Sequence, residues 1–267
     1  MEIIAYAAAA FIGISLGLIG GGGSIMTVPV LVYLFGTNPL LATSYSLFIV
    51  GSTSMVGAYS NYRKGLVSFK TALLFGLTSI STVFLTRKFL IPLIPEHIAQ
   101  FGSFELTAGI LTMVLFAILM VAAAVAMINS GRNKEATRSV GKTELNVPKL
   151  LGYGITIGLA TGLLGAGGGF LLIPTLVLLV GLQMKEAVGT SLLIIALNSL
   201  VGFTGDQGHF QIDWPFLIKV TAIAIAGIFI GGAINKNIDG SKLKIGFGWF
   251  ILLMGILIIT KELILNN

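Results

Sequence analysis

Few residues in this 267-residue sequence carry groups that can do chemistry. It has no cysteine, two histidines and ten acidic residues, and it contains neither an H-E-x-x-H nor a G-x-S-x-G motif. Cysteine nucleophiles and thiolate metal sites are therefore excluded, and a serine nucleophile has no histidine placed to act as its base. We expect no catalytic residue, no metal site and no cofactor.

The distinctive local feature is a pair of glycine-rich segments in similar contexts. Residues 17–29 read GLIGGGGSIMTVP and align without gaps with residues 162–174, which read GLLGAGGGFLLIP. Four successive glycines do not hold a helix, because glycine loses more conformational entropy on folding than any other residue. We expect a break at each (the first break, residues 20–24, and the second break, residues 165–169), followed by a short helix. The Ser24 hydroxyl is expected to cap the first short helix.

Both breaks suit an anion. Exposed N–H groups and the positive end of the helix dipole attract negative charge, and a Thr-Ser pair that can donate hydroxyl hydrogen bonds follows each break. If the breaks face each other near the membrane midplane, they form a substrate site. The alternative is that the glycines only permit close helix packing. The candidate substrate-binding residues are Gly21, Gly22, Gly23, Ser24, Thr43, Ser44, Gly167, Gly168, Gly169, Thr190, Ser191 and Asn198.

Other polar groups in the apolar runs are rare. Asn198 lies within one such run, where it would either contact substrate or hydrogen-bond a neighbouring helix. Asp206 and His209 follow the end of that run and are candidates for carrying a coupling proton, since histidine titrates near neutral pH. The alternative for these two residues is a solvated loop.

The elements that must position these residues are membrane helices. The sequence is 55% hydrophobic and only 10% charged, too apolar to cover a water-soluble globule. It predicts an all-α polytopic membrane protein with about eight transmembrane helices and two short helices after the breaks. The first run lacks a basic leader and is interpreted as a membrane segment. The apolar runs are residues 3–19, 24–35, 40–59, 67–85, 104–128, 150–164, 170–180, 187–205, 214–234 and 243–264.

The gap-free alignment divides the chain into two repeats. We expect a first membrane repeat over residues 1–128, a basic cytoplasmic linker over 129–149 and a second membrane repeat over 150–267. The basic residues lie between apolar runs, which indicates topology signals rather than a nucleic-acid surface. If each broken segment turns back as a hairpin, twelve basic residues lie on one membrane face and four on the other. Single crossings give ten and six, so the hairpin arrangement, which makes the repeats inverted, is favoured.

The motifs at 17–29, 42–44 and 162–174 resemble those of the TauE/SafE family of membrane permeases, the sulfite exporters. The stretches 60–69 and 208–214 are similar to that family's pattern as well, so the resemblance covers nearly the whole chain. It implies secondary transport of sulfite or organosulfur anions such as sulfonates. One departure is Asn61-Tyr62, where family members often carry a histidine.

The same residues distinguish between the possible classes of function. A cation or transition-metal carrier needs carboxylates or imidazoles in its membrane runs, and this sequence offers almost none. We therefore expect a proton-coupled anion carrier in the prokaryotic plasma membrane, with a passive anion channel as the alternative and a membrane-embedded enzyme as a more distant one. The expected partners are a small anion, protons and the lipid bilayer, with no nucleic acid. Glycines such as Gly227 and Gly231 are compatible with an oligomer.

The charge distribution makes a topology prediction. We expect residues 129–149 to be cytoplasmic and both termini to be external. Fusions of a fluorescent protein that folds only in the cytoplasm, placed in the linker and at the C-terminus, test this. We expect fluorescence from the linker fusion alone. Fluorescence from the C-terminal fusion would place the C-terminus in the cytoplasm and contradict the two-hairpin arrangement.

Overall fold

The computed structural model describes residues 2–95, 97–101, 104–132, 147–165, 167–234 and 240–262. The first half of the chain contains α1 (Glu2–Ile19), η1 (Gly20–Met26), α2 (Thr27–Tyr33), α3 (Pro39–Tyr62), α4 (Phe69–Leu85), η2 (Thr86–Leu90), η3 (Ile91–Leu93) and α5 (Ala108–Arg132). The second half contains α6 (Val147–Leu164), α7 (Gly169–Leu179), α8 (Met184–Gly205), α9 (Trp214–Ile234) and α10 (Gly240–Thr260).

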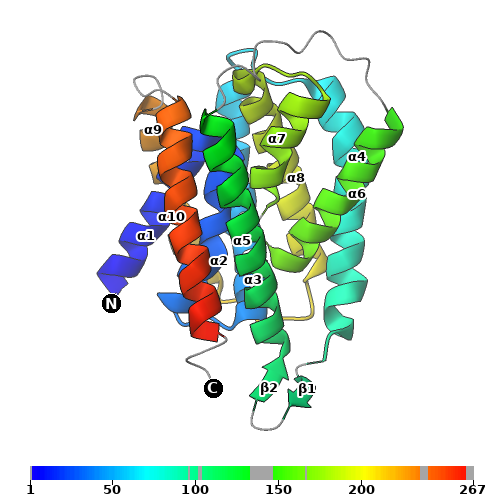
Figure 1. The fold of residues 1–267 in the computed structure, drawn as a ribbon, viewed down its shortest axis with the longest axis vertical. Coiled ribbons are helices and arrows are strands. Elements are labelled where there is room, and N and C mark those ends of the chain that lie inside the picture. The colour runs from blue at the N-terminus through cyan, green and yellow to red at the C-terminus, as the bar shows by residue number, and fades with distance from the viewer. Residues whose placement is uncertain are drawn as a thin grey trace.

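The chain turns back at both glycine breaks. The ring of Tyr6, near the start of α1, lies 5.7 Å from that of Phe35, just after α2, so α2 returns toward the beginning of α1. In Figure 1, α6 descends and α7 rises again. Helix α1 begins and α10 ends in the lower part of the molecule (the terminal side), whereas α5 ends and α6 begins at the upper end (the linker side).

The contacts between helices follow the same pattern in both halves of the chain. If α1–α5 are taken as the counterparts of α6–α10 in order, each contact named below has an equivalent contact. Helix α1 packs on α9 as α6 packs on α4, and α2 packs on α3 as α7 packs on α8. Helices α3 and α8 form a central pair, and α5 and α10 form another. Contacts of Leu47 with Gly202 and of Gly57 with Leu192 make α3 and α8 antiparallel.

Glycines allow the two halves to approach closely. A Cβ on Gly13 would overlap the carbonyl of Ala224 in α9, and a Cβ on Gly158 would lie 2.7 Å from the carbonyl oxygen of Ser79 in α4. Gly158 lies 145 positions after Gly13, and Ala224 lies 145 positions after Ser79, which is the offset between the two glycine motifs. Small residues therefore serve the same packing function in both repeats.

The outer surface is apolar, as expected for a protein surrounded by lipid. Exposed side chains on the outer faces include Leu73, Leu77, Phe229, Ile230 and Leu253. Among the described residues, five helical stretches are long and apolar enough to cross a membrane: 39–62, 69–93, 108–126, 185–205 and 214–234. Shorter apolar helices cover 6–18, 23–33, 150–164 and 248–260.

The structure corrects several expected boundaries. The run expected over 104–128 begins as a strand: β1 (His97–Phe101) and β2 (Phe104–Thr107) form an antiparallel hairpin before α5. Helix also occupies 129–132 and 147–149, which shortens the expected linker, and residues 133–146 of that linker lie outside the described residues. The run expected to end at residue 85 does end there as α4, and the π-helical turn η2, which contains the buried Arg87, follows it directly.

Candidate functional site

The two breaks meet in the interior. A Cβ on Gly21 would overlap the backbone of Gly169, and a Cβ on Gly169 would overlap Gly21. The side chain of Ile195, on α8, packs against both Gly21 and Gly167. The structure therefore brings the glycines of both candidate segments together, and only glycine permits so close an approach of the two backbones.

In the first break, Gly20 ends α1 with a φ of +73°. Residues 20–26 then form a 3-10 helix, in which the Ser24 hydroxyl donates a 2.7 Å hydrogen bond to the Gly21 carbonyl. The expectation that Ser24 caps the following helix was wrong: Met26 occupies the N-cap position of α2 and no side chain caps it. The hydroxyl instead satisfies a carbonyl within the glycine segment, where a break leaves backbone groups without helical partners.

The second break contains three glycines in left-handed conformation. Gly165, Gly167 and Gly168 all have positive φ, and Gly168 is the N-cap of α7, again with no side-chain cap. The carbonyl of Gly165 accepts a 2.7 Å hydrogen bond from Ser46 on α3. Gly167 lies against Val50 and Ile195, so side chains from both halves cover this backbone. Gly20 and Gly165, which align, both have positive φ, so the two breaks begin alike and differ in the residues that follow.

The two Thr-Ser pairs lie on opposite sides of the breaks. Thr43 and Ser44 are near the start of α3 on the terminal side, whereas Thr190 and Ser191 are near the start of α8 on the linker side. All four are buried. The Thr190 hydroxyl accepts a 2.9 Å hydrogen bond from the backbone N–H of Ser68, and Ser191 donates one to Val188. The pairs therefore belong to two different parts of the site.

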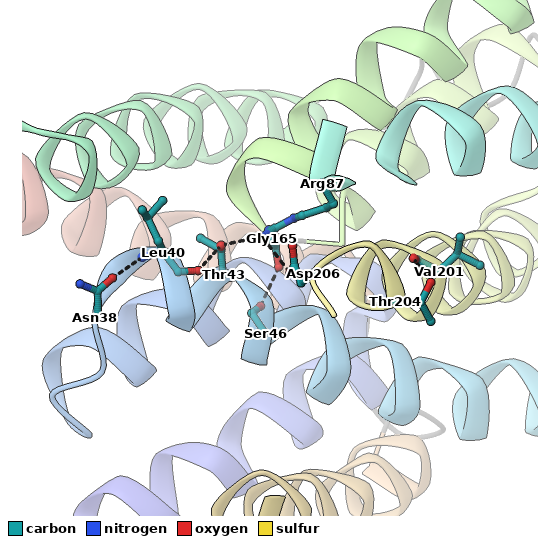
Figure 2. Close-up of polar contacts among 9 residues, drawn as sticks. All are labelled: Asn38, Leu40, Thr43, Ser46, Arg87, Gly165, Val201, Thr204 and Asp206. Atoms are coloured by element: carbon teal, nitrogen blue, oxygen red, sulfur yellow. Dashed lines mark hydrogen bonds and ion pairs between the residues drawn. The ribbon is translucent and has the colours of Figure 1, made fainter. Parts of the chain in front are cut away.

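A buried ion pair lies on the terminal side. Arg87 Nη1 lies 3.2 Å from Asp206 Oδ2 and donates a 3.0 Å hydrogen bond to Thr43 Oγ1, and both charged side chains are 0% exposed. Figure 2 shows these groups beside Gly165 and Ser46, at the second break. Sequence reasoning named Asp206 but treated Arg87 as a topology charge. An arginine that directly follows an apolar run gives no sign of being buried.

The remaining candidates have separate positions. Asn198 is buried and donates a 2.6 Å hydrogen bond to Ser79 on α4, so it joins neighbouring helices. Its Oδ1 has no hydrogen-bond partner among the described residues. His209 is exposed in the loop after α8, and its backbone N–H donates to the carbonyl of Asp206. Within the described part of the chain, no three His, Asp or Glu side chains are grouped to hold a metal ion.

A pocket lies on the linker side. It has a volume of about 340 Å³ and is lined by residues of α1, α3, α8 and α9 and the turn after α3. Ser60, Asn61 and Lys64 supply its polar groups, and none of the described residues that line it is acidic. Val188, in its wall, also contacts Gly20 of the first break. Val188 therefore lies between the pocket and the first break.

The pocket and the ion pair occupy related positions in the two repeats. When the two repeats are aligned with the offset of 145, Gly232 corresponds to Arg87 and Asn61 corresponds to Asp206. Both Gly232 and Asn61 line the pocket. The related position on the linker side therefore carries pocket-lining residues where the terminal side carries the ion pair.

Comparison with known proteins identifies relatives. A profile of the sulfite exporter TauE/SafE family matches residues 5–258. A probable membrane transporter protein of Xylella fastidiosa (strain 9a5c) is 28% identical over 264 residues, which cover 97% of this chain and 95% of that protein. The probable membrane transporter protein YdhB of Bacillus subtilis (strain 168) is 28% identical over 87% of this chain and 90% of its own. No solved structure matches the chain.

The ion pair makes a stability prediction. Arg87→Met or Asp206→Leu alone leaves a buried charge without its partner, and each is expected to lower the free energy of unfolding by about 3–5 kcal/mol. The double variant is expected to be more stable than either single variant. Thermal or detergent unfolding of the purified proteins measures this, with Lys88→Met, one residue along and exposed, as the control. Additive losses in the double variant would show that the two charges do not interact.

Proposed function

Because the chain belongs to the sulfite exporter TauE/SafE family, and is thus a multi-pass membrane transporter of the cytoplasmic membrane, we propose that it moves sulfite or organosulfur anions such as sulfonates. The observation that carries this proposal is the contact of the two glycine breaks between a pocket on one side and a buried arginine on the other. The described lining of the pocket contains Lys64 and no acidic side chain, which favours an anion.

The chain is an inverted repeat in this proposal. The running directions of the helices support it, because α3 and α8 are antiparallel and both broken segments turn back. The packing pattern that survives exchange of the two halves supports it as well. Inverted repeats commonly bind substrate near the midplane at broken helices. The linker side is then cytoplasmic and the terminal side external.

The relation between the pocket and the ion pair suggests alternating access. In this proposal the pocket is the open, linker-side end of the path, and the buried pair of Arg87 and Asp206 closes the terminal side. A rearrangement of one repeat against the other would reverse these two states, which is how inverted-repeat transporters expose one site to each side in turn. A passive channel, in contrast, needs a path that is open on both sides.

Protons are the proposed coupling ion, with Asp206 and His209 as the proposed carriers. Asp206 is the buried acid of the closed side, and His209 follows it in the exposed loop. Protonation of Asp206 would remove the charge that holds Arg87. A proton could then open the terminal side, which would couple its movement to that of the anion.

Transport by purified protein in liposomes tests the proposal. Saturable uptake of labelled sulfite or sulfonates that responds to an imposed pH gradient is the expected result. Flux that ignores the gradient would favour the channel. No flux of any of these anions would overturn the substrate class.

A glycine variant tests the path. Gly168→Leu is expected to reduce this flux at least tenfold, because a side chain at this position of the second break would overlap Thr161 of α6. The control is Gly36→Leu, which has the same φ of +68° but open space around it. Full transport by a folded Gly168→Leu protein would show that the breaks serve only for packing.

A further inference from the structure

We infer that Arg87 binds the transported anion directly, through the Nε–Nη2 edge of its guanidinium group. The ligand class is an oxyanion with at least two oxygens on one centre, such as a sulfonate or sulfite. This inference rests on the proposed function and names the residue that recognises its substrate.

The position of Arg87 is firmly fixed. Its Nη1 is held by Asp206 at 3.2 Å and by Thr43 at 3.0 Å, and the side chain is fully buried. A Cβ added to Gly205 would come within 3.0 Å of the Arg87 Cβ, so α8 packs directly against the start of the side chain. The guanidinium is therefore oriented before any ligand arrives, which lowers the entropic cost of binding one.

Half of this guanidinium is unused. Nε and Nη2 have no hydrogen-bond partner among the described residues, and neither does Oδ1 of Asp206. Arginine and a carboxylate often pair through two parallel hydrogen bonds, but here a single one joins them. The free Nε–H and Nη2–H point the same way and are spaced for two oxygens of one anion. A buried charged donor without a partner is costly, and a bound oxyanion would offset that cost.

The surroundings supply further contacts for an anion. The buried Ser44 hydroxyl approaches the carboxylate of Asp206 and is a further hydroxyl donor beside the ion pair. The backbone of Thr43, which holds Arg87, packs against Gly165 of the second break. Donors from α3 and η2 therefore converge beside the interrupted backbone.

Asp206 is then a competitor for the anion as well as a counter-charge. Without substrate it neutralises the buried arginine. When an oxyanion binds, its negative charge competes with the carboxylate for the same guanidinium. Removing the carboxylate charge should therefore strengthen anion binding, whereas a purely structural ion pair predicts no gain in binding.

Binding and transport of methanesulfonate test the inference. Purified wild-type protein is heated with methanesulfonate or with chloride at equal ionic strength, and KM for methanesulfonate is measured in liposomes. Arg87→Lys keeps the charge but loses the two-pronged edge. We expect its KM to rise at least tenfold and its stabilisation by methanesulfonate to disappear. The matched control, Lys88→Gln, removes an exposed charge one residue along and should behave as the wild type.

A second variant covers the case in which Arg87→Lys fails to fold. Asp206→Asn keeps the shape of the side chain, and we expect it to be stabilised by methanesulfonate at least as strongly as the wild type. Unchanged KM in Arg87→Lys, or loss of methanesulfonate binding in a folded Asp206→Asn, would overturn the inference while wild-type transport persists. Absence of transport and binding in the wild type would instead overturn the proposed function.

Discussion

Interrupted backbone inside a bilayer must be covered by protein or reached by water, because lipid offers no hydrogen bonds. In this protein each break is covered by the opposite half of the chain. Gly21 lies against Gly169, and the carbonyl of Gly165 is bound by Ser46. The close packing of α1 on α9 and of α6 on α4 holds the halves near enough for this. The breaks, the pocket and the ion pair all depend on that mutual covering.

The duplication of one motif was enough to predict the breaks and their meeting, since both follow from local glycine chemistry and from repetition. The conformation of the first break was not predictable, because a 3-10 helix closed by Ser24 depends on its packing. The pairing of Arg87 with Asp206 was missed for a different reason. The partners are 119 residues apart, and no periodicity or motif connects them. The membrane helices could be read from their apolar runs, but the short strands before α5 could not.

Departures from internal symmetry give the molecule its two unlike ends. In the alignment of the two repeats, Gly232 corresponds to Arg87 and Asn61 corresponds to Asp206. One end consequently has a pocket with a lysine at its rim, and the other has a buried ion pair. Two closely related frameworks thus carry different side chains at the same place. In the proposed mechanism this difference lets one path present an anion to each side of the membrane in turn.

The central claim is that anions pass the paired breaks beside Arg87. The chain has no cysteine, so Ser44→Cys creates a single reporter thiol in that path. Its rates of modification by sulfonatoethyl and by trimethylammonioethyl methanethiosulfonate compare an anion and a cation that carry the same reactive group. Relative to a reference thiol at the exposed Gln207, the account predicts at least tenfold faster reaction with the anionic reagent. Equal rates, or faster reaction with the cation, would contradict it.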